Sequence, residues 1–307
     1  MKKIKDIIVN AIRGLCMALA DSVPGVSGGT VAFILGFYDK FIGSLDDIFR
    51  GSIDKKKEAL IFLLKIGIGW VIGFCIAATV LANLFNTQIY AMSSLFMGFI
   101  IFAIPIVIRE EKELLKKNYK NIIFVLVGIA VVVAITLLNP ANGQGISVDI
   151  SNLNIGIAIY VFIAAMIAIS AMVLPGISGS TLLLIFGLYI PIMSAVKEFL
   201  HMNFSYFPIL LIFGLGVITG VLVFVGLIKK CLNNYRAQSI YTIIGMMVGS
   251  LFSIVKGPET LSTPLPAMNF STFSIPFFII GAVIIVLLQI LKNVLDKKEI
   301  KQEEIKE

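Results

Sequence analysis

The chain contains 307 residues, of which 58% are hydrophobic and only 14% are charged, and its mean hydropathy is +1.00. A soluble domain carries about 25% charged residues, so this composition excludes a soluble globular protein and predicts an integral membrane protein. The net charge of +7 does not indicate a nucleic-acid partner, because the basic residues gather in the segments that separate apolar runs.

The first apolar stretch covers residues 7–20 and follows several basic residues, as the core of a signal peptide does. It contains Arg13, runs into Asp21 and has no small-x-small cleavage pattern that would leave the following motif intact. We therefore expect it to be retained in the mature protein. It is short for a full crossing of the bilayer, and Pro24-Gly25 and Gly28-Gly29 directly after it would break a continuous helix.

Longer apolar runs fill the rest of the chain, and most approach the ~20 residues that cross a hydrocarbon layer about 30 Å thick. They cover residues 59–85, 89–108, 121–138, 153–174, 179–196, 207–228, 237–255 and 275–291. Such runs predict an all-α polytopic membrane protein. No sizeable soluble domain fits between them.

Clusters of Lys and Arg mark the side of the membrane that we expect to be cytoplasmic. They lie at the N-terminus, at Arg50 with Lys55–Lys57, at Arg109–Lys120, at Lys229–Arg236 and at Lys292–Lys306. Residues 139–152, in contrast, contain no Lys or Arg. Both termini are therefore predicted to be cytoplasmic.

A proline-glycine-serine motif occurs once in each half of the chain. Residues 20–38 and 171–189, at an offset of 151, share nine identities in nineteen positions. The identical pairs are Ala20/Ala171, Pro24/Pro175, Gly25/Gly176, Ser27/Ser178, Gly28/Gly179, Thr30/Thr181, Ile34/Ile185, Gly36/Gly187 and Tyr38/Tyr189. Glycines match again further on, Gly67-x-Gly69-xxx-Gly73 against Gly214-x-Gly216-xxx-Gly220, at an offset of 147. The pattern predicts an internal duplication.

Each half holds an odd number of apolar elements, so the second copy is expected upside down relative to the first. We therefore predict one transmembrane domain made of an inverted-topology repeat, residues 1–145 and 146–307. Because the elements flanking each motif are short or broken, we favour six full transmembrane helices plus two re-entrant helical hairpins. Full crossing by those elements is the alternative, since the charges fit both arrangements.

A broken helix with this composition offers unpaired amide donors, a glycine surface and a hydroxyl, which together suit a phosphate or carboxylate. The candidate substrate-binding residues are Arg13, Asp21, Ser22, Gly25, Ser27, Gly28 and Thr30 in the first half and Gly176, Ser178, Gly179, Ser180 and Thr181 in the second. In the alternative interpretation, Pro and Gly only kink two packed helices, and the hydroxyls bond to carbonyls one turn back.

Arg13 and Asp21 are the ionisable residues near the first motif, and Met172 stands at the position matching Asp21. A charge at membrane depth indicates a functional role by default. Arg13 either attracts an anionic head group or lies at the lipid interface. Asp21 is either a proton-coupling carboxyl or a helix cap in the turn.

An enzyme is the third class of function to weigh, because Gly25-Val-Ser27-Gly28-Gly29 fits the G-x-S-x-G nucleophile pattern and resembles the GxSG of rhomboid proteases. A serine nucleophile needs a base within hydrogen-bond reach, and His201 is the single histidine of the chain. Cys16, Cys75 and Cys231 have no CxxC spacing, so no disulfide framework or zinc site is indicated. We expect no catalysis, no cofactor and no metal.

The run from Ala18 to Tyr38, with its partner from Met172 to Thr181, resembles the polyprenyl-phosphate transporter family of bacteria and archaea, and the resemblance extends over nearly the whole chain. It implies a translocase that returns undecaprenyl phosphate from the outer to the cytoplasmic leaflet of a prokaryotic plasma membrane for cell-envelope synthesis. The implied site falls on residues 21–30 and 172–181. Its partners would be the lipid phosphate, membrane lipids and, as a candidate coupling ion, protons. A channel or secondary transporter for a small soluble anion is the alternative.

Overall fold

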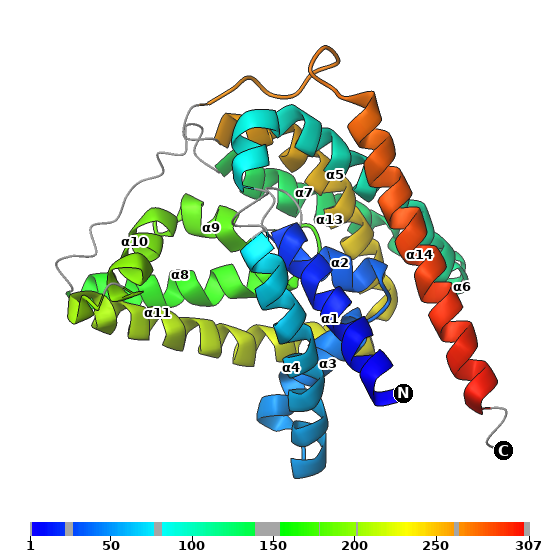
Figure 1. The fold of residues 1–307 in the computed structure, drawn as a ribbon, viewed down its shortest axis with the longest axis horizontal. Coiled ribbons are helices and arrows are strands. Elements are labelled where there is room, and N and C mark those ends of the chain that lie inside the picture. Colours follow the sequence, from blue (N-terminus) through cyan, green and yellow to red (C-terminus); the bar gives the residue numbers. More distant parts are fainter. Residues whose placement is uncertain are drawn as a thin grey trace.

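A computed structural model of the chain describes residues 2–21, 27–76, 82–138, 154–177, 179–200, 202–260 and 264–303. All secondary structure in these residues is helical, which confirms the all-α prediction (Figure 1). In the first half the elements are α1 Lys2–Asp21, α2 Gly28–Ile34, α3 Tyr38–Arg50, α4 Ile53–Ile76, α5 Ala82–Glu110, α6 Lys112–Lys117, η2 Tyr119–Ile122 and α7 Ile123–Leu138. In the second half they are α8 Ile155–Val173, α9 Gly179–Ile185, α10 Tyr189–Leu200, η3 Phe204–Tyr206, α11 Phe207–Gly220, η4 Val221–Val225, α12 Gly226–Asn234, α13 Arg236–Lys256, η5 Gly257–Thr260 and α14 Ile275–Glu303.

Six helices in the described part of the chain are long and apolar enough to cross a membrane. They are Ile53–Ile76, Gln88–Glu110, Tyr119–Leu138, Ile155–Val173, Phe204–Asn234 and Arg236–Glu259. The number equals the predicted number of full spans, but one member differs. α8, expected as an arm of a hairpin, is 19 residues long and runs unbroken from its cap at Asn154. α14, expected as a span over residues 275–291, is a helix from Ile275 to Glu303, and Ile275–Leu287 is its described apolar stretch.

Helices α1 and α4 pack in direct backbone contact, and α8 and α11 repeat that contact at matching positions. A Cβ on Gly69 would lie 1.7 Å from the Ala11 carbonyl oxygen, and one on Gly216 would lie 2.5 Å from the oxygen of Phe162. Gly69 and Gly216 are related by the repeat offset of 147, and the residues that they face, Ala11 and Phe162, are related by the offset of 151. Small residues let backbones approach where lipid gives helices no hydrophobic drive to associate. Gly69 and Gly73 of the glycine pattern, with their counterparts Gly216 and Gly220, therefore form a packing seam.

A second pair of helix contacts is also matched, and it joins the halves to each other. α5 packs against α14, where a Cβ on Gly98 would lie 2.1 Å from the Phe278 carbonyl oxygen. α13 packs against α7, where a Cβ on Gly245 would lie 2.1 Å from the oxygen of Val125. Gly98 and Gly245 again differ by 147. The last helix of each half thus packs on the other half.

Two of the repeated glycines end the short helices that follow the motifs. Gly36 after α2 has φ of 71°, and Gly187 after α9 has φ of 65°. Both lie in the left-handed region that is open to glycine at little cost, as expected for a residue just past a helix end. Their identity in both halves therefore reflects a backbone requirement.

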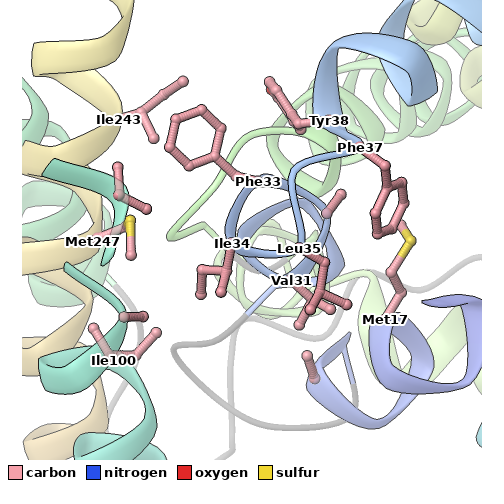
Figure 2. Packing of buried hydrophobic residues seen from close by; sticks show 14 of the residues in the cluster. Met17, Val31, Phe33, Ile34, Leu35, Phe37, Tyr38, Ile100, Ile243 and Met247 are labelled. Atoms are coloured by element: carbon pink, nitrogen blue, oxygen red, sulfur yellow. The ribbon is translucent and has the colours of Figure 1, made fainter. Parts of the chain in front are cut away.

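Helix α2 lies in the interior of the helix bundle, and all seven of its residues are buried. Figure 2 shows Phe33 directed towards Ile243 of α13, and Ile34 lying on the side of Met247 and Ile100. Met17 of α1 lies on the opposite side, beside Leu35 (Figure 2). Irregular backbone at membrane depth is tolerated only where protein or a watery cavity surrounds it. Burial of α2 meets that condition for the first motif.

Candidate functional site: the junction of the two motif turns

The start of α2 lies against the turn that follows α8, near the point where α1, α2 and α8 converge in Figure 1. The Ser27 hydroxyl donates a hydrogen bond of 3.0 Å to the carbonyl oxygen of Leu174, 147 residues away in sequence. The Gly176 amide donates one of 2.8 Å to the Thr30 hydroxyl. The first motif therefore binds the backbone of the second through its side chains.

Ser27 is the N-cap residue of α2. Its Oγ accepts a hydrogen bond from the Thr30 amide at 3.2 Å, and it lies 3.1 Å from Thr30 Oγ1. Both side chains are completely buried. These hydroxyls bond to the opposite motif and to each other. The simple kink interpretation, with bonds to carbonyls one turn back, does not describe them.

Glycines make the close approach of the two turns possible. A Cβ on Gly29 would lie 2.5 Å from the Val173 carbonyl oxygen. Gly176 has φ of +84°, and a Cβ there would lie 2.6 Å from the carbonyl oxygen of Met246 on α13. In this conformation the glycine surface admits the opposing backbone rather than a ligand.

Asp21, the last residue of α1, caps the start of α2. Its Oδ1 accepts a hydrogen bond of 2.6 Å from the amide of Gly28, the first residue of α2. Its Oδ2 accepts one of 3.2 Å from Trp70 Nε1 on α4. The carboxylate therefore occupies the amide donor at the start of α2, where the sequence led us to expect an anionic ligand. Nothing in the sequence singled out Trp70 as its partner.

Arg13 lies apart from the junction. Its Nη1 donates to Asn10 Oδ1 at 3.0 Å, and its guanidinium carbon stands 4.9 Å from the centre of the Phe37 ring, just beyond α2. Arg13 and Asp21 are eight residues apart on one helix, which corresponds to a separation of about 12 Å. Both alternatives for Arg13, a head-group ligand or an interfacial charge, stay predictions.

The remaining predicted site residues divide into those on α9 and those outside the described residues. Gly179 is buried at the start of α9, and Thr181 is half-buried on the same helix. Ser22, Gly25, Ser178 and the side chain of Ser180 lie outside the described residues. The structure thus brings together Asp21, Ser27, Gly28, Thr30 and Gly176.

A polar cavity of about 160 Å³ adjoins the far end of α2. Its lining residues are Phe33, Gly36, Tyr38, Asp39, Val107, Glu110, Glu111 and Arg236. Tyr38 connects this cavity to the junction, because its ring lines the cavity and its hydroxyl donates to the Val173 carbonyl oxygen at 3.3 Å. The sequence did carry a signal for this residue, since Tyr38 and Tyr189 are identical in the repeat.

The described contacts of Ser27 bear on the serine-nucleophile interpretation. Its hydroxyl proton is directed at a peptide carbonyl, which is not a general base. His201 lies outside the described residues. Across the parts of the chain that the structure describes, no group of three or more metal-binding side chains occurs, and none of the three cysteines forms a disulfide.

Comparisons with known proteins give consistent similarities. A family model described as undecaprenyl phosphate translocase-like matches residues 17–272. A polyprenyl-phosphate transporter of Staphylococcus aureus is 36% identical over 259 residues, which cover 82% of this chain and 87% of the relative. A polyprenyl-phosphate transporter of Vibrio cholerae is 32% identical over 282 residues, 85% of each chain. No solved structure matches the chain.

Proposed function

The chain belongs to the undecaprenyl phosphate translocase-like family, and from this premise we propose that it carries polyprenyl phosphate across the membrane by binding the phosphate at the junction of the two motif turns. The observation that carries the proposal is the meeting of Ser27 and Thr30 with Leu174 and Gly176. A polyprenyl phosphate joins an anion to a long apolar tail. The anion needs such a polar junction, whereas the tail can stay in lipid.

The donors of the junction are those that a phosphate accepts from, namely two hydroxyls and backbone amides. In the present conformation the Ser27 hydroxyl donates to the Leu174 carbonyl oxygen of the second motif. The Gly176 amide donates to the Thr30 hydroxyl of the first motif. We propose that the head group replaces these contacts when the turns separate, so that its oxygens accept from the same donors. The groups that join the two motifs would then hold the ligand. The other predicted site residues would complete the shell, and they are Ser22, Gly25, Ser178, Gly179, Ser180 and Thr181.

In this proposal, the Asp21 carboxylate competes with the head group for the hydrogen bond of the Gly28 amide. A carboxylate repels a phosphate, so the head group gains that donor more readily when Asp21 has taken up a proton. The second pKa of a phosphate monoester is about 6, and the head group itself therefore also exchanges a proton near neutral pH. Protons are for this reason the coupling ion that we propose.

An inverted repeat of residues 1–145 and 146–307 is the architecture that we propose for the transport cycle. Matched packing of α1 on α4 and α8 on α11, and of α5 on α14 and α13 on α7, supports it. The short, fully buried α2 supports re-entrant hairpins at the motifs. Rocking of such halves around a central site would expose the site to each side in turn.

The charge pattern of the sequence supports cytoplasmic termini. The resemblance to the transporter family supports the direction of transport and the location. We propose a prokaryotic plasma-membrane protein with cytoplasmic termini that returns undecaprenyl phosphate from the outer to the inner leaflet. No step of this cycle requires hydrolysis, so we propose transport without catalysis.

The test is reconstitution of the full chain into vesicles that contain polyprenyl phosphate in both leaflets. A soluble phosphatase added outside hydrolyses only the outer pool unless the protein delivers the inner one. Thr30→Val should slow delivery roughly tenfold or more, because a hydrogen bond to a charged group contributes about 1.5–3 kcal/mol. Thr219→Val is the matched control, since its hydroxyl bonds one turn back to the Leu215 carbonyl oxygen on α11.

Equal delivery by wild type, Thr30→Val and Ser27→Ala would contradict a head-group site at the junction. Uptake of inorganic phosphate by the same vesicles, without delivery of the lipid, would instead identify a carrier for a soluble anion.

A further inference from the structure

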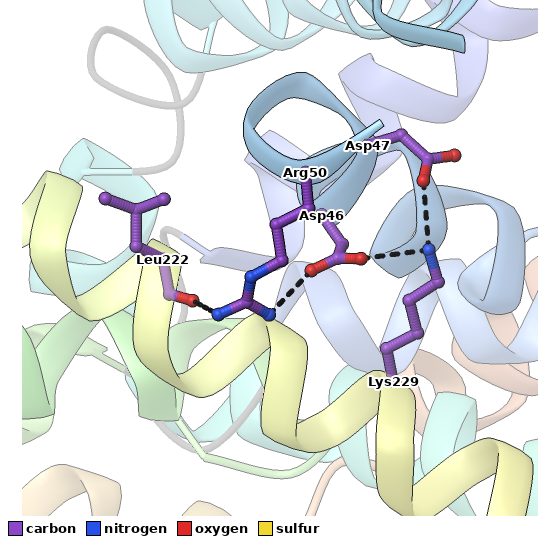
Figure 3. A network of polar contacts seen from close by, with 5 residues as sticks. All are labelled: Asp46, Asp47, Arg50, Leu222 and Lys229. Atoms are coloured by element: carbon purple, nitrogen blue, oxygen red, sulfur yellow. Dashed lines mark hydrogen bonds and ion pairs between the residues drawn. The ribbon is translucent and has the colours of Figure 1, made fainter. Parts of the chain in front are cut away.

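A polar network fastens the end of α3 to the second half of the chain (Figure 3). Lys229 of α12 places its Nζ 3.0 Å from Asp46 Oδ2 and 3.0 Å from Asp47 Oδ1. Asp46 and Asp47 belong to α3, and Lys229 follows them by more than 180 residues. One lysine is thus shared by two neighbouring carboxylates, and it balances half of their charge.

Arg50, at the last turn of α3, adds a second link to the same region. Its Nη1 pairs with Asp46 Oδ1 at 2.9 Å, and its Nη2 donates to the carbonyl oxygen of Leu222 at 2.8 Å. Leu222 lies in η4, a π-helical turn, and such turns occur frequently at functional sites. Gly226 leaves room for the guanidinium, because a Cβ there would lie 1.6 Å from Arg50 Nη1.

The start of α3 is fastened in a similar way. Arg236, the first residue of α13, pairs with Asp39 at 2.7 Å and with Glu111 at 2.7 Å. α3 is therefore tied at both ends to helices of the second half, by charged groups that are partly exposed to solvent. Ion pairs of that kind are weak and reversible, which suits a contact that has to open.

The corresponding helix of the other half, α10, has other residues at the matching positions. The offset of 151 relates Asp46 and Asp47 to Lys197 and Glu198, and the offset of 147 relates Lys229 to Ala82. Within the described ranges, the helices that pack on α10 are α9, η3 and α11, all from its own half. Among the described side chains, the ionic fastening to the opposite half is therefore found at α3.

We propose that α3 is the closing element on one side of the transport path, and that Lys229 with Asp46 and Asp47, reinforced by Arg50 on Leu222, is the latch that holds it closed. This inference rests on the proposed function for the identity of the path, but the latch itself is a conformational device. The structure is the state in which the α3 side is closed. The sequence positions that match Asp46, Asp47 and Lys229 hold Lys197, Glu198 and Ala82, which cannot form the same ion pairs, so the two sides open with unequal ease.

The experiment measures the distance between spin labels on Cys substituted for Ser52, just after α3, and for Asn233 on α12. Both positions are exposed, and the native cysteines are replaced by serine in this background. The full chain is reconstituted in lipid without any substrate. Lys229→Gln should add a population at longer distance, and Lys229→Arg should keep the wild-type distribution because the charge is retained.

Lys230→Gln is the matched control, since Lys230 is the exposed neighbour of Lys229. Gly226→Ala is a second variant that keeps all four charges but takes the space of the Arg50 guanidinium, so it should also lengthen the distance. An unchanged distribution in Lys229→Gln, or an equal shift in Lys230→Gln, overturns the latch. A shift in Lys229→Gln and Gly226→Ala, in vesicles that deliver no polyprenyl phosphate, sustains the latch and refutes the proposed function.

Discussion

The amide of Gly176 donates a hydrogen bond to the hydroxyl of Thr30 across 146 residues of sequence, and neither group is accessible to solvent. The contact joins two copies of one motif, but it is not symmetric, because a side chain of the first copy binds the backbone of the second. The first motif thereby supplies the hydroxyls and the second supplies the peptide groups. Two copies of one motif thus perform two different tasks at one place.

Thr30→Val should destabilise the protein by about 1–3 kcal/mol, the cost of leaving a buried donor without a partner. The orphaned donor is the Gly176 amide, and the isosteric methyl group of valine cannot accept its hydrogen bond. Thermal unfolding in detergent measures the loss. Thr30→Ser should retain most of the wild-type stability, since it keeps the oxygen. An equally large loss in Thr30→Ser would assign the effect to packing instead.

Gly69→Ala should destabilise the α1–α4 seam far more than Gly67→Ala. A Cβ at Gly69 would collide with the Ala11 carbonyl oxygen at 1.7 Å, whereas a Cβ at Gly67 meets nothing within 4 Å. At Gly67 the alanine should even add up to about 1 kcal/mol through its better helix propensity. Thermal stability of the two variants, two residues apart on one helix, provides the measurement. Similar melting temperatures would contradict the seam.

Asp21→Asn separates the two roles of this side chain. The amide oxygen of asparagine can still accept from Gly28 or Trp70, so the fold should survive with a loss of about 1 kcal/mol, typical of a weakened cap. Transport should lose the part of its pH dependence that comes from Asp21 and keep the part that comes from the phosphate. Initial rates of polyprenyl phosphate delivery between pH 5.5 and 8, a range set around the phosphate pKa of about 6, are the readout. A wild-type pH profile in Asp21→Asn would leave the carboxyl as a cap only.

Tyr38→Phe removes the hydrogen bond from the tyrosine hydroxyl to the Val173 carbonyl oxygen while it keeps the ring at the cavity wall. We expect the free energy of unfolding to fall by about 1 kcal/mol, the contribution of one hydrogen bond. We also expect slower transport, because Val173 at the end of α8 is no longer held by this bond. Tyr119→Phe is the control, since Tyr119 is 65% exposed. Identical behaviour of the two variants would show that the tether contributes nothing.

Much of the architecture could be predicted from residue patterns. Apolar runs predicted the helices because a membrane span needs length and hydrophobicity. Both are properties of a short continuous stretch of sequence. The repeated glycines were found as a pattern, although their function as a packing seam needed the positions of the facing helices.

Contacts between distant residues could not be predicted in the same way. Trp70 gave no periodic or motif signal, because its bond to Asp21 depends on the packing of α1 against α4. Lys229 read as one more basic residue of a cytoplasmic cluster, and only the packing of α12 beside α3 shows its two carboxylate partners. α8 was expected to be one arm of a hairpin, yet it is long enough to span, since nothing breaks the helix between its cap and Leu174.

The sequence by itself determined that this is an all-helical membrane protein with a duplicated motif, because hydropathy, helix breakers and repeats are properties of neighbouring residues. Tertiary structure alone decided what the motif residues touch. Ser27 and Thr30 bind the opposite turn, Asp21 occupies the amide donor of Gly28, and Lys229 holds α3. Hydrogen bonds act over about 3 Å, so their partners are fixed only when chain packing brings segments more than a hundred residues apart to that distance.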